Sequence, residues 1–196
     1  MPLIKPFTGL RPAPGLAAAV AAPPYDVMNA AEARRMVQDR PWSFLHISRP
    51  EVDLPATVDP FDAAVYARAR ENLEQMLEAG VLIRDPSPCY YAYRLTMGSH
   101  HQTGLVAAAS VAAYDSDRIK KHEFTRPVKE DDRVRQIDAL DAQTGPVFLV
   151  YRANAAIDDR LAIICQQAPE VDITAADGVR HQLWVIADSA TGAQLG

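Results

Sequence analysis

The chain has 196 residues, of which 48% are hydrophobic and 23% charged, and this ordinary globular composition argues against wholesale disorder. Its formal net charge of -5 disfavours a generic nucleic-acid binder, because such proteins usually carry a basic excess. No apolar run approaches the ~20 residues that span a bilayer, and the first residues lack the order of a secretion signal. We therefore expect a cytoplasmic protein whose Cys89 and Cys165 are reduced thiols.

Most of the 15 prolines lie before residue 61, so this part is predicted to consist of extended segments and turns with one inserted helix. That helix is predicted to start after the N-cap residue Asn29 and to end at Pro41. The apolar segment SFLHISR, residues 43–49, is typical of a short buried strand. Apolar residues at helical spacing then predict a long helix that starts at Asp59-Pro60 and stops at Gly80.

The best hairpin lies in the middle of the chain, where CYYAYRLTM (89–97) and TGLVAAASVAAY (103–114) flank the turn-like GSHHQ. A helix entered through Pro127 is predicted from about Val128 to Asp141, with Val134, Ile137 and Leu140 facing inward.

The last third of the chain contains PVFLVY (146–151), a nearly all-apolar segment that predicts a central strand. An amphipathic helix follows at 156–167, and 171–177 and 180–188 are typical of a final strand pair. Because strands and helices are interspersed and at least one strand pair is antiparallel, the sequence predicts an α+β fold. We expect one domain over residues 1–196.

The mixed-charge segment KKHEFTRPVKEDDRVRQIDAL, residues 120–140, is the first candidate site. Thr125 is predicted to cap the helix that follows, and the free amides of that helix start favour an anion. Lys129 and Arg133 lie one turn apart and could grip a phosphate or carboxylate. The alternative is an exposed helix whose charges form surface pairs worth ~0–1 kcal/mol each. The adjacent His122 and Glu123 would point to opposite faces of a strand, so each would seek its own partner.

Two segments nearer the start of the chain are further candidates. In APPYDV the double proline fixes the place of Tyr25 and Asp26, and Asp26 could orient a basic residue, bind a metal or simply cap a turn. In FLHISRPE an imidazole, His46, lies in the predicted strand, where a histidine is usually a satisfied core residue. Arg49 and Glu51 follow that strand and are better placed for a ligand, because strand ends commonly carry sites.

A set of segments occurs in a fixed order along the chain: PPYDV, SFLHISRPEVDLP, QTGLVAAASVAAY, IKKHEFTRPVKEDDR and TGPVFLVY. The ordered set resembles the bacterial family catalogued as domain of unknown function 1015, over about Ile4 to Asp188. The polar residues that this resemblance carries over by position are Tyr25, Asp26, His46, Arg49, Glu51, His122, Glu123, Thr125, Lys129 and Arg133.

The resemblance implies a cytosolic bacterial protein, often encoded near serine-biosynthesis enzymes, whose relatives are much longer than this chain. It also implies a D-G-H-H-R signature downstream of LWVIAD, similar to one in the ParB/sulfiredoxin-like fold, which includes kinases of free serine. The signature is absent here, and GSHHQ lacks its Asp and Arg. We therefore expect an amino-terminal fragment or a naturally short member, without any activity that needs the signature.

The leading hypothesis is one lobe of a small-molecule enzyme that transfers a phosphoryl group to a small hydroxy compound such as serine, with ATP or ADP and Mg²⁺. Lys129 and Arg133 would steady phosphate charge, His122 or Glu123 would position or deprotonate the hydroxyl, and Asp26 would hold Mg²⁺. The alternative is a non-catalytic domain that senses an anionic metabolite or nucleotide. A nucleic-acid module is disfavoured by the acidic balance of the chain. The sequence leaves the oligomeric state open, and a homo-oligomer is one of the options.

Overall fold

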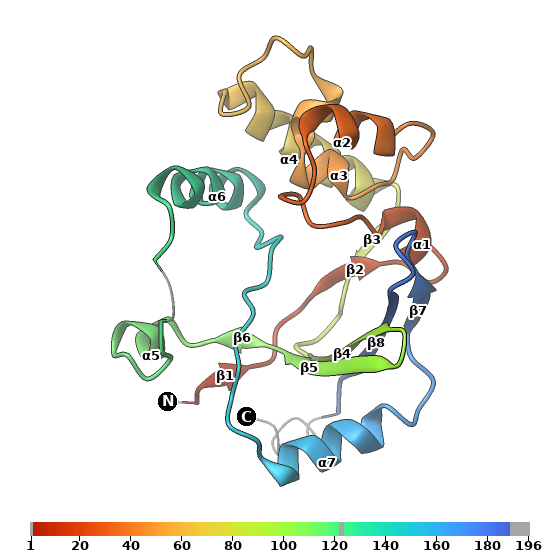
Figure 1. Ribbon diagram of the computed structural model, residues 1–196, viewed down its shortest axis with the longest axis vertical. Coiled ribbons are helices and arrows are strands. Elements are labelled where there is room, and N and C mark those ends of the chain that lie inside the picture. Colours follow the sequence, from red (N-terminus) through yellow and green to blue (C-terminus); the bar gives the residue numbers. More distant parts are fainter. Residues whose placement is uncertain (1, 122–123, 189–196) are drawn as a thin grey trace. The chain divides into compact units, whose positions relative to one another are not determined.

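The computed structural model describes residues 2–121 and 124–188, and the chain divides into two compact units. Helices and antiparallel strands both occur, which confirms the α+β class (Figure 1). The single domain predicted for residues 1–196 stays a prediction. The sheet unit consists of Met1–Ala18, Ile83–Glu123 and Val150–Gly196, and the helical unit consists of Ala19–Leu82 and Phe124–Leu149.

An antiparallel four-stranded sheet, in the order β5-β4-β8-β7, forms the centre of the sheet unit. The pairings of β4 with β5 and of β7 with β8 confirm the predicted hairpin and the predicted last strand pair. Pairing of β4 with β8 joins them into one sheet. The strands are β4 (Tyr90–Met97), β5 (His100–Val106), β7 (Val171–Thr174) and β8 (Arg180–Ile186).

Helix α7 (Ala155–Ile164) packs along one face of this sheet and buries the core of the unit (Figure 1). Side chains alternate across a strand, so Ala92 of β4 and its partner Trp184 of β8 share the covered face. The indole N–H of Trp184 donates to the carbonyl of Gln167, 2.9 Å away, so its polar atom is satisfied. The core cluster consists of Tyr90, Ala92, Leu161, Ile164, Trp184 and Ile186.

Tyr91 of β4 fastens the beginning of the chain to the sheet. Its hydroxyl accepts the N–H of Gly9 at 2.9 Å and donates to the carboxylate of Asp85 at 2.7 Å, while Arg11 pairs with the same carboxylate at 2.9 Å. A Cβ at Gly9 would lie 2.5 Å from the Tyr91 oxygen, so any other residue there would force the Tyr91 hydroxyl to shift. Burial, followed by the hydrogen bond to Asp85, raises the pKa of Tyr91.

The sheet unit also contains shorter elements, and here one prediction is wrong. The strand predicted over 103–114 ends at Val106, and the alanine-rich end of that segment forms a short helix instead. Ser110 starts this helix by accepting the N–H of Ala113. The elements are β1 (Ile4–Lys5) paired with β6 (Ala108–Ala109), β2 (Leu10–Pro12) paired with β3 (Leu82–Arg84), and α5 (Val111–Asp115).

Helix α4 is the centre of the helical unit, since α6, α3 and the 3₁₀ helix η1 all pack against it. Its apolar stripe is buried at helical spacing, as the sequence predicts, through Val65, Ala69, Leu73 and Met76, whereas Leu77, which belongs to the same predicted stripe, is 37% exposed. The helices are α1 (Ala17–Val20, where the chain passes between the units), α2 (Ala30–Met36), α3 (Leu45–Ser48), η1 (Pro50–Asp53), α4 (Ala63–Glu78) and α6 (Pro127–Leu140). No helix in the described part combines the length and apolar character needed to cross a bilayer.

Local capping signals in the helical unit predict the start of α2 correctly. Asn29 accepts the N–H of Glu32 at 2.9 Å, and the Glu32 carboxylate accepts the N–H of Asn29 at 2.8 Å, which completes a capping box. Helix α4 begins after Asp62 rather than at Pro60, and it stops before Gly80, whose φ of 67° suits glycine.

Two predicted strands are absent. Residues 43–49 contain helix α3, in which Leu45 and Ile47 are both buried and the amides bond locally, as Ile47 does to Phe44 at 3.0 Å. Periodicity does not separate helix from strand in so short an apolar run. The segment 146–151 pairs with no strand among the described residues, and it is exposed, with Phe148 73% and Val150 84% accessible. Apolar composition alone therefore gave a wrong prediction there.

The buried face of α6 also differs from the prediction. Val134 is 49% exposed, whereas Asp132, Gln136 and Leu140, at positions i, i+4 and i+8, are buried. Both polar members of this face are satisfied: Asp132 accepts the hydroxyl hydrogen of Tyr66 at 2.9 Å, and the Gln136 amide donates to the carbonyl of Ile47 at 2.8 Å. Hydrophobic periodicity misses this face because it treats polar residues as outward-facing.

Replacing Gln136 by alanine should lower the free energy of unfolding by about 1–3 kcal/mol, since the carbonyl of Ile47 would lose its donor. The control Val134→Ala, close by in sequence but exposed, should stay within about 0.5 kcal/mol of the parent. Urea unfolding followed by circular dichroism measures both. If Val134→Ala lowers the free energy of unfolding more than Gln136→Ala does, Val134 lies on the buried face, as periodicity predicted.

Candidate functional site

Residues 22–28, which precede α2 and contain two prolines, form a segment that we call the arm. Arg49 connects the arm to the 3₁₀ helix η1. Its Nη1 donates to the carbonyls of Tyr25 and Met28, at 2.7 and 3.0 Å, and its Nε donates to the Glu51 carboxylate at 2.6 Å. Both side chains of this ion pair are less than one-fifth exposed. The guanidinium therefore fixes the backbone of the arm and holds the Glu51 side chain of η1.

A second guanidinium, that of Arg133 on α6, lies against the ring of Tyr25 with its central carbon 4.3 Å from the ring centre. Its Nε and Nη2 donate to the Asp132 carboxylate at 3.2 and 2.7 Å. The other oxygen of Asp132 accepts from Tyr66, whose pKa rises to about 12 through burial and then through this bond. The helical unit thus brings four predicted site residues together: Tyr25, Arg49, Glu51 and Arg133.

The remaining predicted residues of the mixed-charge segment and of the arm do not join this group by any contact in the described residues. Asp26 and Lys129 are exposed. The hydroxyl of Thr125 donates to the Glu130 carboxylate, and the N-cap of α6 is Arg126, so the predicted cap by Thr125 is wrong. His122 and Glu123, the other two candidate catalytic residues, lie outside the described residues.

His46, the last predicted residue, lines a hollow of about 320 Å³ in the helical unit, which we call the His46 hollow. Its walls come from the residues before α3, from α3 and η1, and from one face of α4. The lining residues are Pro41, Trp42, His46, Asp53, Arg68, Asn72, Gln75 and Met76.

The imidazole of His46 is bound at both nitrogens. Nδ1 lies 2.9 Å from the Asp53 carboxylate and Nε2 lies 3.1 Å from the carbonyl oxygen of Arg40. Because both partners are acceptors, the two bonds together require a doubly protonated ring. The bond to Asp53 raises the pKa of His46 in spite of partial burial. Burial alone would raise the pKa of Asp53, but the bonds from His46 and Asn72 outweigh it and lower that pKa.

Two polar residues of α4 complete the hollow. The Asn72 amide donates to the carbonyl of His46 at 2.7 Å and to the Asp53 carboxylate at 2.8 Å. The Nη1 of Arg68 pairs with Glu71 at 3.0 Å, but its Nε is buried without a hydrogen-bond partner in the described residues. A buried guanidinium N–H without an acceptor is costly, so Arg68, which lines the hollow, keeps an unused donor.

Asp53, Arg68 and Asn72 were missed by sequence reasoning. A signal for two of them exists, since Arg68 and Asn72 are spaced i, i+4 and border the apolar stripe of α4 at Ala69 and Leu73. A polar residue placed among buried helical positions must find a buried partner.

The family model described as "Protein of unknown function (DUF1015)" matches residues 4–195 of the chain. A search of curated proteins and a search of solved structures returned no match. The resemblance is therefore confirmed at the level of the family, and the likeness to the ParB/sulfiredoxin-like fold stays an expectation.

The His46–Asp53 pair should make the stability of the helical unit depend on pH. The folded pKa of His46 lies above its ordinary value of 6.5, so its contribution is complete below 6.5 and is lost as pH rises through the folded pKa. At the acid end the pair is lost as pH falls through the lowered folded pKa of Asp53. His46→Gln should remove this part of the pH dependence of the unfolding free energy, whereas His101→Gln, at an exposed strand position, should not. An NMR titration in which Asp53→Asn leaves the His46 pKa unchanged would contradict the assignment.

Proposed function

The chain belongs to the DUF1015 family, and from the geometry of its helical unit we propose that it binds a small metabolite carrying a carboxylate or phosphate group in the His46 hollow. The observation that carries the proposal is the buried Nε–H of Arg68, which has no acceptor among the described residues. An anionic oxygen placed in the hollow would supply that acceptor, and a hydrogen bond between two charged groups is the strong kind.

The other donors around the hollow support the same ligand class. Within the described residues, the indole N–H of Trp42 and the amide of Gln75 take part in no hydrogen bond, so both can donate to an incoming oxygen. The protonated ring of His46 adds positive charge, although Asp53 offsets it. The volume of about 320 Å³ is at the small end of ligand pockets, which favours a metabolite over a nucleotide.

Binding is favoured over catalysis at this site. A general base needs a nitrogen with a free lone pair, and both nitrogens of His46 are engaged, by Asp53 and by the carbonyl of Arg40. The imidazolium therefore acts as a fixed part of the wall. This favours the alternative drawn from the sequence, a domain that senses an anionic metabolite.

Phosphoryl transfer to serine stays a prediction. Two of its proposed catalytic residues, His122 and Glu123, lie outside the described residues, and Asp26 is exposed. Within the described residues, no cluster of three or more His, Cys, Asp or Glu side chains is arranged to hold a metal ion. The predictions about ATP or ADP, nucleic acid, oligomeric state and cytoplasmic location are likewise untested.

Inorganic phosphate, L-serine and O-phospho-L-serine are suitable probes of the hollow, with the indole N–H of Trp42 as the NMR reporter. The indole N–H of Trp184, bonded inside the sheet unit, is the internal reference. We expect at least one probe to shift the Trp42 signal in a saturable manner. Arg68→Gln should weaken this binding roughly ten- to a hundredfold, which is the loss of a hydrogen bond to a charged group.

Arg70→Gln is the matched control, because Arg70 lies on the same helix and pairs with Glu74 at 2.8 Å on the exposed surface. Arg68→Lys keeps the charge but loses Nε, so it should restore only part of the affinity. The proposal is wrong if no probe shifts Trp42, or if Arg68→Gln and Arg70→Gln weaken binding equally.

A further inference from the structure

We propose that a second hollow of the helical unit, separate from the His46 hollow, binds a small aliphatic carboxylate. This methionine hollow measures about 400 Å³, within the range of small-ligand pockets. It shares no lining residue with the His46 hollow, so the proposal does not rest on the proposed function. Its lining residues are Pro23, Val27, Met28, Glu32, Arg35 and Met36.

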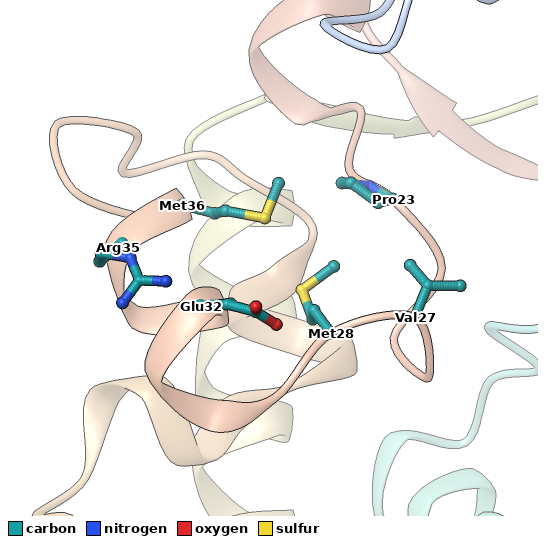
Figure 2. Close-up of a pocket in the computed structure, with 6 residues that line it drawn as sticks. All are labelled: Pro23, Val27, Met28, Glu32, Arg35 and Met36. Atoms are coloured by element: carbon teal, nitrogen blue, oxygen red, sulfur yellow. The ribbon is translucent and has the colours of Figure 1, made fainter.

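The interior of the methionine hollow is apolar. Figure 2 shows the side chains of Met28 and Met36 between helix α2 on one side and Pro23 and Val27 on the other. Val27 is 67% exposed, so a branched apolar side chain of the arm is left in water beside two thioethers. Methionine is unbranched and polarisable and adapts to an apolar partner of irregular shape. This wall suits an aliphatic chain of a few carbons.

The two charged residues of the hollow, Glu32 and Arg35, are not equivalent. One oxygen of the Glu32 carboxylate accepts the N–H of Asn29 at 2.8 Å in the capping box, which commits that group to the helix start. Arg35 is exposed, and its guanidinium pairs with no group among the described residues. Glu32 keeps its negative charge, but the donors that remain unpaired beside the apolar wall among the described residues belong to Arg35, and a carboxylate is the group that matches a guanidinium.

The two walls of the hollow are held in place before any ligand arrives. Arg49 donates to the carbonyls of Tyr25 and Met28, at 2.7 and 3.0 Å, which fixes the arm. The next residue, Asn29, caps α2 and so connects the arm to the helix in one geometry. A pre-formed wall loses little conformational freedom on binding, which favours affinity for a small ligand.

The test uses the full chain with 4-methylpentanoate as the probe, and the ε-methyl NMR signals of Met28 and Met36 as reporters. Saturable shifts of both signals are expected, with no shift of the Trp42 indole. The uncharged 4-methylpentanamide should bind roughly ten- to a hundredfold more weakly, because the charge-assisted bond to Arg35 is lost. L-Leucine, which adds an ammonium group, distinguishes a free amino acid from a simple carboxylic acid as the source of the carboxylate.

The variant Arg35→Gln should cause the same loss as the amide, and Arg70→Gln on α4 should cause none. Val27→Asp places a carboxylate at an exposed position of the apolar wall, so it should abolish binding without unfolding the chain. Two results would overturn the proposal: no saturable shift of the Met28 and Met36 signals, or an affinity that Arg35→Gln leaves unchanged. Because the reporters differ, failure here and failure at the His46 hollow are told apart.

Discussion

The functional geometry of the helical unit depends on the Arg49 guanidinium. Its three bonds hold the arm at Tyr25 and Met28 and the 3₁₀ helix η1 at Glu51. η1 ends at Asp53, so the same residue that fixes a wall of the methionine hollow also fixes the carboxylate that holds His46. A hydrogen bond that involves a charged group stabilises a fold by about 1.5–3 kcal/mol, and here the larger effect is on position. An uncharged substitute would lose the ion pair with Glu51.

Buried polar residues give the helical unit its register. Asn72 of α4 and Asp132 and Gln136 of α6 are all buried, and each is bonded to a specific partner. A slip of α6 by one residue would leave Gln136 and the carbonyl of Ile47 without each other, at the cost of an unsatisfied group. Apolar contacts alone would tolerate such a slip more easily, because they are not directional.

Several local interactions were predicted correctly, although the cap predicted for Thr125 was not. The cap by Asn29, the stop at Gly80 and the turn between β4 and β5 depend on residues within four positions of each other. Sequence reasoning failed where burial depends on a distant partner. Residues 43–49 are too short for periodicity to separate strand from helix, and the apolar segment 146–151 resembles a core strand although it is exposed.

The candidate site was predicted in part for the same reason. Arg49 and Glu51 are two residues apart, and a charged pair next to a proline is visible in the sequence. The contact of Arg133 with Tyr25 joins segments more than a hundred residues apart, and neither segment carries a local signal that selects the other as its partner. Arg68 escaped notice because a charged residue on a helix ordinarily faces solvent.

The sequence left two interpretations of the charges of α6 open, namely surface ion pairs and an anion site, and different residues of the helix fit each of them in part. On its outer face Arg135 pairs with Asp131 at 2.7 Å, an exposed i, i+4 bridge of the kind that contributes little. On its inner side Arg133 is held by the ring of Tyr25 and by Asp132, so one face and one edge of the guanidinium are already occupied.

The hydrogen-bonding part of a ligand's affinity comes from donors and acceptors that the protein has not yet paired, because exchanging one good partner for another gains little. Arg49 donates to three acceptors within the fold, and Arg133 donates to Asp132 while it stacks on the ring of Tyr25, so both act as its frame. Arg68 retains a buried N–H without an acceptor among the described residues, and it lies in the wall of a hollow. A ligand oxygen that reaches it would relieve an existing cost as well as form a bond, which is why the anion site is proposed there and not at the more conspicuous charges of α6.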